Sequence, residues 1–442
     1  MGREPGRGGW RTRTLAPDAR ASYGLRLATF YGALFAVYGV HLPYLPVWLD
    51  VRGLTAEQIA AITAAPYFLR VLITPAVALW ADASGRHRAL INGLAWLALL
   101  LAVLFTRMQT FWPIFLLAVP FAIALSSIVP LTETLAVAGA RAHALDYGRM
   151  RLWGSITFVA AGFIGGWLID HVGTGAVTGC ILASMVATVA CAWALPERAG
   201  GNSSRRRAEG EPAAVPGAEG FTTPAVLQSP SPDSRARNAS NLEEARKLVA
   251  SPLFLAFLVA AGCAQAAHGM FYAFGALHWH AQGISTAWVG VLWAIAIVGE
   301  VALFAYSDYA VRRWGPTTLL VAATAASAAR WVLMSVSPPL LALFPLQTLH
   351  TLTYGASHLG AMHFIARAVP EGAQGTAQAL YATVASGVLM GAATLSSGWL
   401  YARIGVQAYL AMAALAAVGF AAALIVRARW TGGLLWDDAK SA

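Results

Sequence analysis

Residues 56–106 read AEQIAAITAAPYFLRVLITPAVALW-ADASGRHR-ALINGLAWLALLLAVLFT, and this stretch decides the fold. Two apolar runs, 56–80 and 89–106, flank a short polar loop. A bilayer core about 30 Å thick needs roughly 20 apolar residues per helix. The stretch therefore predicts a helical hairpin that crosses a membrane twice and leaves its loop in water.

The rest of the chain has the same character. Of its 442 residues, 58% are hydrophobic and only 11% are charged, whereas soluble domains carry about a quarter charged residues. Because a soluble protein this apolar could not coat its surface, we expect an all-α membrane protein. Twelve runs have spanning length: 27–49, 56–80, 89–106, 112–138, 152–170 and 175–195, then 252–279, 287–307, 317–336, 340–366, 377–401 and 406–427.

Polar segments divide these runs into two sets of six and predict their orientation. We expect a basic tail (1–26), an N-terminal six-helix bundle (27–195), a flexible cytoplasmic linker (196–250), a C-terminal six-helix bundle (251–428) and a second tail (429–442). With the N-terminus in the cytoplasm, 25 of the 30 basic residues fall in cytoplasmic segments and three in outside loops. Cytoplasmic loops are enriched in Lys and Arg. Both termini are therefore predicted to be cytoplasmic, and the net charge of +10 reflects topology in a bacterial inner membrane rather than nucleic-acid binding.

An internal repeat relates the two halves. Three short matches recur in order, 226, 230 and 232 residues apart: Asp82-Ala-Ser-Gly-Arg-His-Arg88 with Ser307-Asp-Tyr-Ala-Val-Arg-Arg313, Gly53-Leu-Thr with Gly283-Ile-Ser, and Gly166-Trp-Leu-x4-Gly173 with Gly398-Trp-Leu-x4-Gly405. An offset of six spans gives both halves the same orientation, which is a parallel repeat about an axis along the membrane normal. The repeat predicts two pseudo-symmetric bundles around a cavity at the midplane.

The first of these motifs resembles a known loop. Asp82-x-x-Gly85-Arg86-x-Arg88 is similar to the loop motif of major facilitator transporters, although Ala78 replaces its usual first glycine and Val311 replaces the loop glycine of the second copy. The resemblance implies the major facilitator fold and a gating role for charges at the cytoplasmic helix ends: Asp82, Gly85, Arg86, Arg88, Arg149, Arg151, Asp308 and Arg312.

A narrower resemblance covers most of the chain. Residues 146–158, DYGRMRLWGSITF, look like the start of the fifth span in the phenylpropionate-transporter-like subgroup, whose relatives include lactose and nucleoside proton symporters. Further features that are similar are Tyr38-Gly39 with Pro43 and Pro46, Glu300, Arg330-Trp331, and His350 with His358. This resemblance implies a small organic solute moved by alternating access.

Ionisable residues inside predicted spans of the second half are the strongest candidates for a site. Each costs about 2.5–3.5 kcal/mol to insert, so such residues tend to be paired or functional. Glu300 could exchange a proton or form a structural ion pair with Arg330. Arg330 must face a carboxylate, either that of Glu300 or that of a substrate. His350, Tyr354 and His358 recur every four residues and share one helical stripe, and the acid–arginine–histidine set resembles the proton-coupling cluster of lactose permease.

The first half supplies three more candidates. Glu133 could act in proton coupling, gating or substrate binding, or pair with Arg149 or Arg151. Arg70 is the predicted N-half contact for an anionic substrate group, and its alternative is a partner for Glu133. Tyr38 lies on a tyrosine stripe that would line the cavity or serve in packing.

Together these residues predict a secondary transporter rather than an enzyme. We expect proton-coupled symport of a small organic anion, such as an aromatic carboxylate related to 3-phenylpropionate. Substrate contacts are assigned to Arg70, Tyr38, Arg330 and Tyr354, and proton coupling to Glu300, His350, His358 and Glu133. Open alternatives are a neutral sugar or nucleoside as solute, small-molecule efflux, and a sensor or membrane-embedded enzyme. Neither lysine follows a glycine as a nucleotide-binding loop requires. We therefore expect no cofactor, no metal and no nucleic acid, only a solute, protons and lipid, with a monomeric chain.

Overall fold

The computed structural model of the chain describes residues 17–196 and 234–436, and these residues are predominantly helical. Six α-helices follow one another in the first half: α1 (Pro17–Val51), α2 (Ala56–Ser84), α3 (His87–Thr106), α4 (Phe111–His143), α5 (Tyr147–Val172) and α6 (Gly175–Trp193). Each coincides with one of the spans predicted from hydropathy.

The second half is more broken. It contains α7 (Ser234–Ala250), α8 (Pro252–Ala266), η2 (Phe271–Gly275), α9 (Ala276–Ala281), α10 (Thr286–Ala305), α11 (Ser307–Trp314), α12 (Pro316–Met334), α13 (Leu340–Thr348), η3 (Thr351–Ala356), α14 (Ser357–Ala368), η4 (Glu371–Ala373), α15 (Gln374–Tyr381), η5 (Ala382–Leu389), α16 (Met390–Ile404), η6 (Gly405–Ala408) and α17 (Tyr409–Arg429). The segments η2, η3 and η5 are π-helical. They widen helices that otherwise continue through them.

Ten helical segments within the described residues are long and apolar enough to cross a membrane. The last of them, Glu371–Arg429, is 59 residues long and changes direction at Gly405, whose φ is 57°. The stretch Leu340–Ala368, which contains the predicted tenth span 340–366, is built from α13, η3 and α14 and is not among the ten. The chain is therefore a multi-pass helical membrane protein.

Local sequence signals explain where the helices begin and end. At the start of α2, the Thr55 hydroxyl accepts the Gln58 amide hydrogen, and the Gln58 side chain accepts that of Thr55, which is a capping box. Gly85 ends the same helix with φ at 66°, a left-handed conformation that favours glycine. Asp146 caps α5 by accepting the Arg149 amide hydrogen at 3.0 Å.

The predicted linker 196–250 needs a correction. Its last part, Ser234–Ala250, is the helix α7 rather than flexible chain. The helix packs against α8 and α15, with Leu248 fully buried and Glu244 accepting a hydrogen bond from Thr376 at 3.0 Å. Residues 197–233 of the linker lie outside the described part of the chain.

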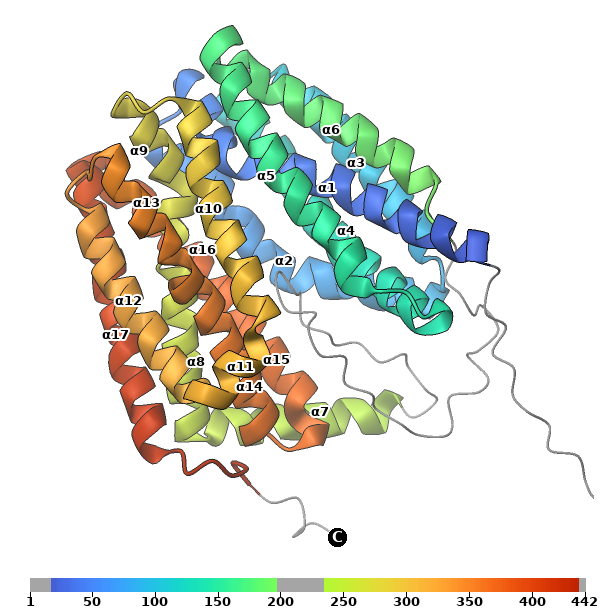
Figure 1. The fold of residues 1–442 in the computed structure, drawn as a ribbon, viewed down its shortest axis with the longest axis vertical. Coiled ribbons are helices and arrows are strands. Elements are labelled where there is room, and N and C mark those ends of the chain that lie inside the picture. The colour runs from blue at the N-terminus through green and yellow to red at the C-terminus, as the bar shows by residue number, and fades with distance from the viewer. Residues whose placement is uncertain (1–16, 197–233, 437–442) are drawn as a thin grey trace, which may run out of the picture.

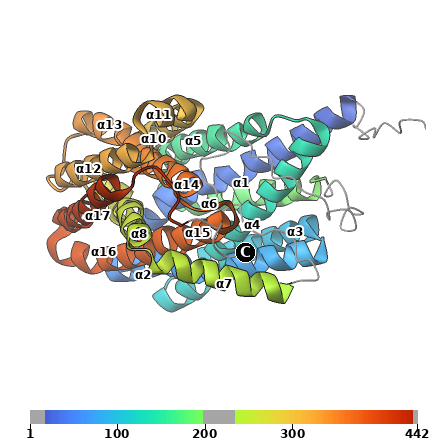
Figure 2. The same cartoon turned by 90° about the horizontal axis from the view of Figure 1, so that it is seen from below.

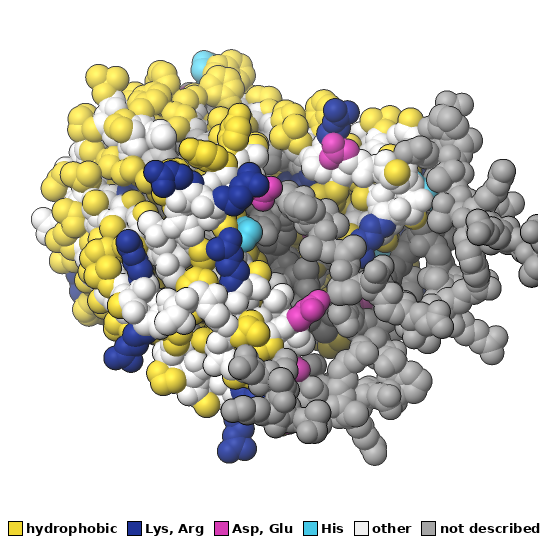
Figure 3. All heavy atoms as spheres, turned by 60° about the horizontal axis from the view of Figure 1, so that its bottom comes forward, with side chains coloured by type: hydrophobic (Ala, Val, Ile, Leu, Met, Phe, Trp, Pro, Cys, Tyr) yellow, Lys and Arg dark blue, Asp and Glu magenta, His cyan; other side chains and the backbone are white. Residues whose placement is uncertain are grey.

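Figure 1 shows α1–α6 on one side of the molecule and α8–α17 on the other, with α7 at the bottom of the second half. Figure 2, seen from below, shows the same division and α7 running along that end. Two helix pairs make the main contacts between the halves, α5 with α10 and α2 with α16. Basic side chains gather on the face that Figure 3 brings forward, and hydrophobic side chains cover the flanks around it.

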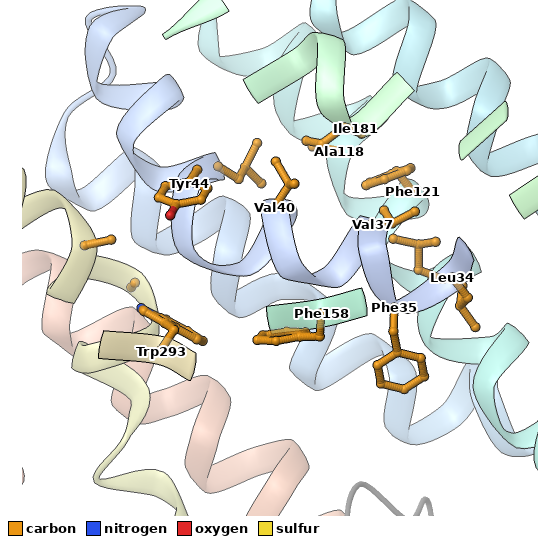
Figure 4. Close-up of a cluster of buried hydrophobic side chains, with 14 of the residues drawn as sticks. Leu34, Phe35, Val37, Val40, Tyr44, Ala118, Phe121, Phe158, Ile181 and Trp293 are labelled. Carbon is orange, nitrogen blue, oxygen red and sulfur yellow. The ribbon is translucent and has the colours of Figure 1, made fainter. Parts of the chain in front are cut away.

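Helix α1 organises the core of the first half. Val37 and Val40 are buried and face Phe121 of α4 and Ile181 of α6 (Figure 4). On the opposite side of α1, Phe158 of α5 lies near Trp293 of α10, with ring centroids 6.4 Å apart. An aromatic contact therefore joins the halves beside the helix at the centre of the first half.

Candidate functional site

Three of the predicted residues meet in the second half. His350 Nε2 lies 2.7 Å from Glu300 Oε1, and His350 Nδ1 lies 3.1 Å from an Arg330 guanidinium nitrogen. Glu300 and His350 are each 4% exposed and Arg330 is fully buried. His350 therefore lies between Glu300 and Arg330. A direct Glu300–Arg330 ion pair, which was one expectation, is replaced by contacts through His350.

Three further polar residues, which the sequence analysis did not single out, complete this cluster. Arg330 donates to Thr353 Oγ1 at 3.1 Å and to Gln347 Oε1 at 3.0 Å. His268, in the turn between α8 and η2, lies 3.0 Å from Thr353 Oγ1. Gln347, His350 and Thr353 recur every three residues, so they share a helix face, and this spacing was the signal that could have revealed them.

The stripe predicted for His350, Tyr354 and His358 is only partly kept. The rings of His350 and Tyr354 stack with centroids 5.4 Å apart. His358 follows the π-helical segment η3 and packs near Phe304 and Tyr381 instead, at 6.4 Å from each ring. A π-helical turn holds more residues than an α-helical turn, so four-residue spacing no longer keeps side chains in line. Proton coupling by His358 stays a prediction.

A pocket lies where α10 separates from α1 and α5. It is lined by Arg151 and Ser155 of α5, by Glu300 of α10, and by apolar side chains: Phe35, Phe158, Ile297, Val301 and Phe304. One wall thus presents a cation from the first half and the other presents the acid of the Glu300 cluster.

Arg151 reaches the pocket from a second ion-pair network. Its Nε lies 3.4 Å from Glu133 Oε1, and the Tyr147 hydroxyl donates to the other carboxylate oxygen. Its guanidinium carbon lies 4.0 Å from the Phe35 ring centroid. Arg149, the other predicted partner of Glu133, is exposed and pairs with Asp146 at 3.4 Å.

Arg70 lies on a different contact between the halves. It donates to the Ser386 carbonyl of η5, and its guanidinium carbon lies 4.7 Å from the Tyr67 ring centroid. Glu133 and Arg70 contact different residues, so the structure does not show the alternative in which these two residues pair. Tyr38 is half-buried and packs on Phe35 at 5.5 Å.

A polar clasp joins the halves at the end where α5 finishes and α10 begins. Asp170 accepts the amide hydrogens of Thr286 at 2.8 Å and Ala287 at 2.9 Å, and the Thr286 hydroxyl hydrogen-bonds to it at 2.6 Å. The Tyr44 hydroxyl donates to the Gly162 carbonyl at 2.7 Å and lies 3.0 Å from that of Thr286. Asp170 was not predicted, because its partners are more than 100 residues away in sequence.

The repeated Gly-Trp-Leu motif lies at this clasp and at its counterpart. A Cβ atom on Gly166 would lie 2.2 Å from the Thr286 carbonyl oxygen, and one on Gly398 would lie 2.3 Å from the Ala60 Cβ. Glycine is therefore required where α5 meets α10 and where α16 meets α2. Beside the second contact, Arg403 pairs with Glu57 at 3.6 Å.

At the opposite end, Asp82 and Arg88 contact residues of the first half. Asp82 Oδ1 lies 3.1 Å from His87 Nε2, and Arg88 donates to the Trp193 carbonyl at 2.7 Å. Asp308 and Arg312 lie on the short helix α11. The gating roles of Asp82, Gly85, Arg86, Arg88, Asp308 and Arg312 stay predictions.

Comparison with known proteins gives matches over most of the chain. The model of the MFS_1 like family matches residues 24–411. The chain is 31% identical over 391 residues to the probable 3-phenylpropionic acid transporter of Escherichia coli K12, covering 88% of this chain and 94% of that protein. It is 28% identical over 383 residues to the maltose permease of Geobacillus stearothermophilus, covering 85% and 86%.

Solved structures share the arrangement of helices. The nucleoside transporter NupG superposes with a TM-score of 0.71 at 16% identity, covering 92% of this chain and all of that one. A bacterial homologue of the human lysosomal transporter Spinster, inward-facing and unoccupied, superposes with a TM-score of 0.64 at 15% identity, covering 94% of this chain and all of that one. At these identities the likeness concerns the fold.

Proposed function

This chain belongs to the MFS_1 like family of major facilitator transporters, and from that premise we propose that it is a proton-coupled symporter of a small organic anion. The resemblance inferred from its motifs is confirmed, and transport by a multi-pass membrane protein of this type follows from the family. Coupling to protons, the aromatic carboxylate as solute, a bacterial inner membrane and twelve spans with cytoplasmic termini belong to the proposal.

The observation that carries the proposal is the buried chain Glu300–His350–Arg330 beside a pocket that both halves line. A carboxylate inside a membrane protein tends to be paired or functional. Glu300 is paired with His350, and its position at the edge of the pocket supports a functional role. A proton that binds Glu300 would remove the only negative charge of the Glu300–His350–Arg330 series and leave the Arg330 charge uncompensated. An anion entering the pocket would then restore neutrality, which links proton and solute binding.

Two features support an aromatic carboxylate. Phe35, Phe158 and Phe304 offer an apolar lining for a ring. Arg70 has a carbonyl and an aromatic ring as its contacts, and a solute carboxylate would give its charge a partner. Arg330, by contrast, lies behind His350, so we assign it to the proton cluster first. The 3-phenylpropionic acid transporter among the relatives carries this solute class in its name.

Alternating access supplies the transport step. With both termini cytoplasmic, the clasp of Asp170 and Thr286 closes the outer end, while α5 and α10 diverge around the pocket toward the inner end. The chain is thus proposed to be in an inward-facing state, and rocking of the halves about the pocket would expose it to the outside.

A second candidate is proton symport of a neutral sugar or nucleoside. It is favoured by the maltose permease at 28% identity and by the fold shared with NupG. In that case Arg330 and Arg70 would serve the protein's own groups, and anions would not compete for uptake. Small-molecule efflux by the same fold is a further alternative, and vesicles of opposite orientation would reveal it.

The test is uptake into proteoliposomes that contain the purified full-length chain. Labelled 3-phenylpropionate, maltose and uridine are compared with an inward proton gradient, and a pH-sensitive dye follows solute-driven proton entry. We expect accumulation of 3-phenylpropionate and proton entry with it. The variant Arg70→Gln should lose about 10- to 100-fold in apparent affinity, because a hydrogen bond to a charged group contributes about 1.5–3 kcal/mol.

The exposed Arg107 offers a matched control, since Arg107→Gln removes the same charge at the end of α3, from a residue without an assigned role. Accumulation of maltose or uridine without that of the anion would favour the second candidate. Anion uptake that does not move protons would contradict the proposed coupling.

A further inference from the structure

The donor and acceptor of each hydrogen bond around Arg330 can be assigned, starting from His268. Its Nδ1 lies 3.0 Å from the Ala264 carbonyl oxygen and 3.2 Å from that of Gln265. Carbonyl oxygens only accept, so Nδ1 carries a hydrogen. Among the described residues, the fully buried His268 contacts carbonyl oxygens, the Thr353 hydroxyl and aromatic rings but no carboxylate, and Arg330 is one hydroxyl away. A second positive charge there would be buried without a partner, so the ring is neutral and Nε2 is an acceptor.

Thr353 transmits this direction to Arg330. Its hydroxyl oxygen lies 3.0 Å from the acceptor nitrogen of His268, so the hydroxyl donates to it. The oxygen then has lone pairs left for the Arg330 guanidinium hydrogen at 3.1 Å. Thr353 is fully buried. Its hydroxyl therefore links the neutral imidazole of His268, in the turn after α8, to the cation on α12.

Arg330 fixes the tautomer of His350 in turn. A guanidinium only donates, and the nitrogen that holds Thr353 also lies 3.1 Å from His350 Nδ1. Nδ1 must therefore accept, and the ring hydrogen sits on Nε2, which lies 2.7 Å from Glu300. A second proton on His350 would point an N–H group at the N–H group of Arg330. Within this hydrogen-bonded series, the group that can gain or lose a proton is the Glu300 carboxylate.

We propose that His268 and Thr353 are positioning residues that hold Arg330 on His350 and so confine the exchangeable proton to Glu300. This inference rests on the proposed proton coupling at Glu300 and adds a role that the motifs did not assign. Arg151 faces Glu300 across the pocket from the first half. The other neighbours of the cluster are aromatic: Tyr354 stacks on His350, Tyr272 lies 5.8 Å from His268, and Trp331 packs on Tyr409 at 5.5 Å. Gln347 provides the remaining neutral acceptor for Arg330.

The test replaces Thr353 and follows protonation of Glu300 directly. Infrared spectra of the purified, reconstituted full-length protein are recorded across pH, and the carboxyl band lost in Glu300→Gln identifies Glu300. In Thr353→Val, Arg330 loses one of its anchors and can approach the carboxylate, which favours the charged form. We expect the midpoint of protonation to fall by about one pH unit, a tenfold loss of proton affinity, while Thr353→Ser restores the wild-type midpoint.

Two further variants separate positioning from stability. Thr324→Val makes the same chemical change at a different buried threonine, on α12, whose hydroxyl bonds only its own helix, at 2.8 Å to Leu320, and should leave the midpoint unchanged. His268→Phe should shift it in the same direction by less, because the Thr353 hydroxyl can turn to the His350 carbonyl at 3.4 Å. If Thr353→Val does not fold, His268→Phe provides the measurement.

Each outcome has a separate meaning. An unchanged midpoint in both Thr353→Val and His268→Phe would overturn the positioning role and leave the proposed symport standing. An equal shift in Thr324→Val would also overturn it, since the effect would then be general. A wild-type protein without a titrating Glu300 band would instead overturn the proposed proton coupling.

Discussion

The clasp at Asp170 offers a quantitative test of how the halves are held together. Asp170→Ala removes the hydrogen bonds from the Thr286 and Ala287 amides and one acceptor of the Thr286 hydroxyl, which also lies 2.7 Å from the Gly166 carbonyl oxygen. Hydrogen bonds to charged groups contribute about 1.5–3 kcal/mol when buried, and loss of a side-chain cap at a helix start costs about 1 kcal/mol. Because Asp170 is exposed, we discount for solvent screening and expect a loss of about 2 kcal/mol.

That loss of free energy changes the equilibrium between conformations in which the α5–α10 end is closed and those in which it is open. The clasp exists only while the α5–α10 end is closed, so about 2 kcal/mol shifts the closed-to-open ratio about 30-fold. An open state populated at about 1% would rise to roughly a quarter of the molecules. Asp170→Asn keeps an oxygen acceptor for Thr286 and should give an intermediate shift.

Distances between spin labels report this ratio. Labels at Thr110, at the start of α4, and at Val336, just after α12, are exposed and lie in different halves. They would be placed in a chain without Cys180, Cys191 and Cys263. We expect a longer-distance population to appear in Asp170→Ala. Arg403→Gln provides the control, because its half-exposed pair with Glu57 at 3.6 Å is worth less than about 1 kcal/mol. A distribution that is the same in Asp170→Ala and wild type would refute the reasoning.

Three other substitutions test the remaining contacts. Gly166→Val would place a Cβ atom 2.2 Å from the Thr286 carbonyl, so the same spin labels should report an open population at least as large as in the Asp170 variant. Glu300→Gln removes the proposed proton acceptor and should reduce gradient-driven accumulation to background, while solute exchange without a gradient, measured in the same vesicles, continues. Arg151→Gln leaves Glu133 without its ion pair, and a thermal melt should show a loss of about 2–3 kcal/mol of stability.

Matched controls accompany these three variants. Gly179→Val adds the same side chain to a glycine with open space around it and should leave the label distances unchanged. Glu57→Gln removes a half-exposed carboxylate and should keep accumulation. Arg149→Gln removes an exposed guanidinium and should melt as the wild type does. An Arg151 variant of wild-type stability would mean that Glu133 is held by Tyr147 and solvent rather than by the pair.

The fold followed from the sequence wherever one physical property repeated along the chain. Apolar run length is such a property, and the first six helices coincide with the predicted spans. The predicted linker failed over Ser234–Ala250 because that helix is polar and is held by contacts such as Leu248 against the second half. A hydropathy scan detects lipid-facing helices and has no signal for a polar helix that packs on protein.

The candidate site was predictable for the charges and much less so for their neutral partners. Glu300, Arg330 and His350 stood out because charged and polar groups are costly in lipid, and the structure brings them together. His268 and Thr353 were not singled out, since one neutral polar residue in an apolar run is unremarkable in composition. The choice between Arg149 and Arg151 needed the helix phase, which depends on Asp146 being the cap of α5.

The π-helical segments make the two halves mechanically unequal. Helices α1–α6 are α-helical throughout, whereas η2, η3 and η5 interrupt helices of the second half next to His268, His350 and Ser386. A π turn holds one more residue than an α turn, so it can tighten by releasing that residue and rotate the rest of its helix. The second half can thus rotate parts of its helices at these segments, whereas α1, α2 and α4 of the first half each contain two interior prolines, which kink helices by a different route. The sequence repeat makes the halves look alike, yet within the described residues only the second contains π-helical segments.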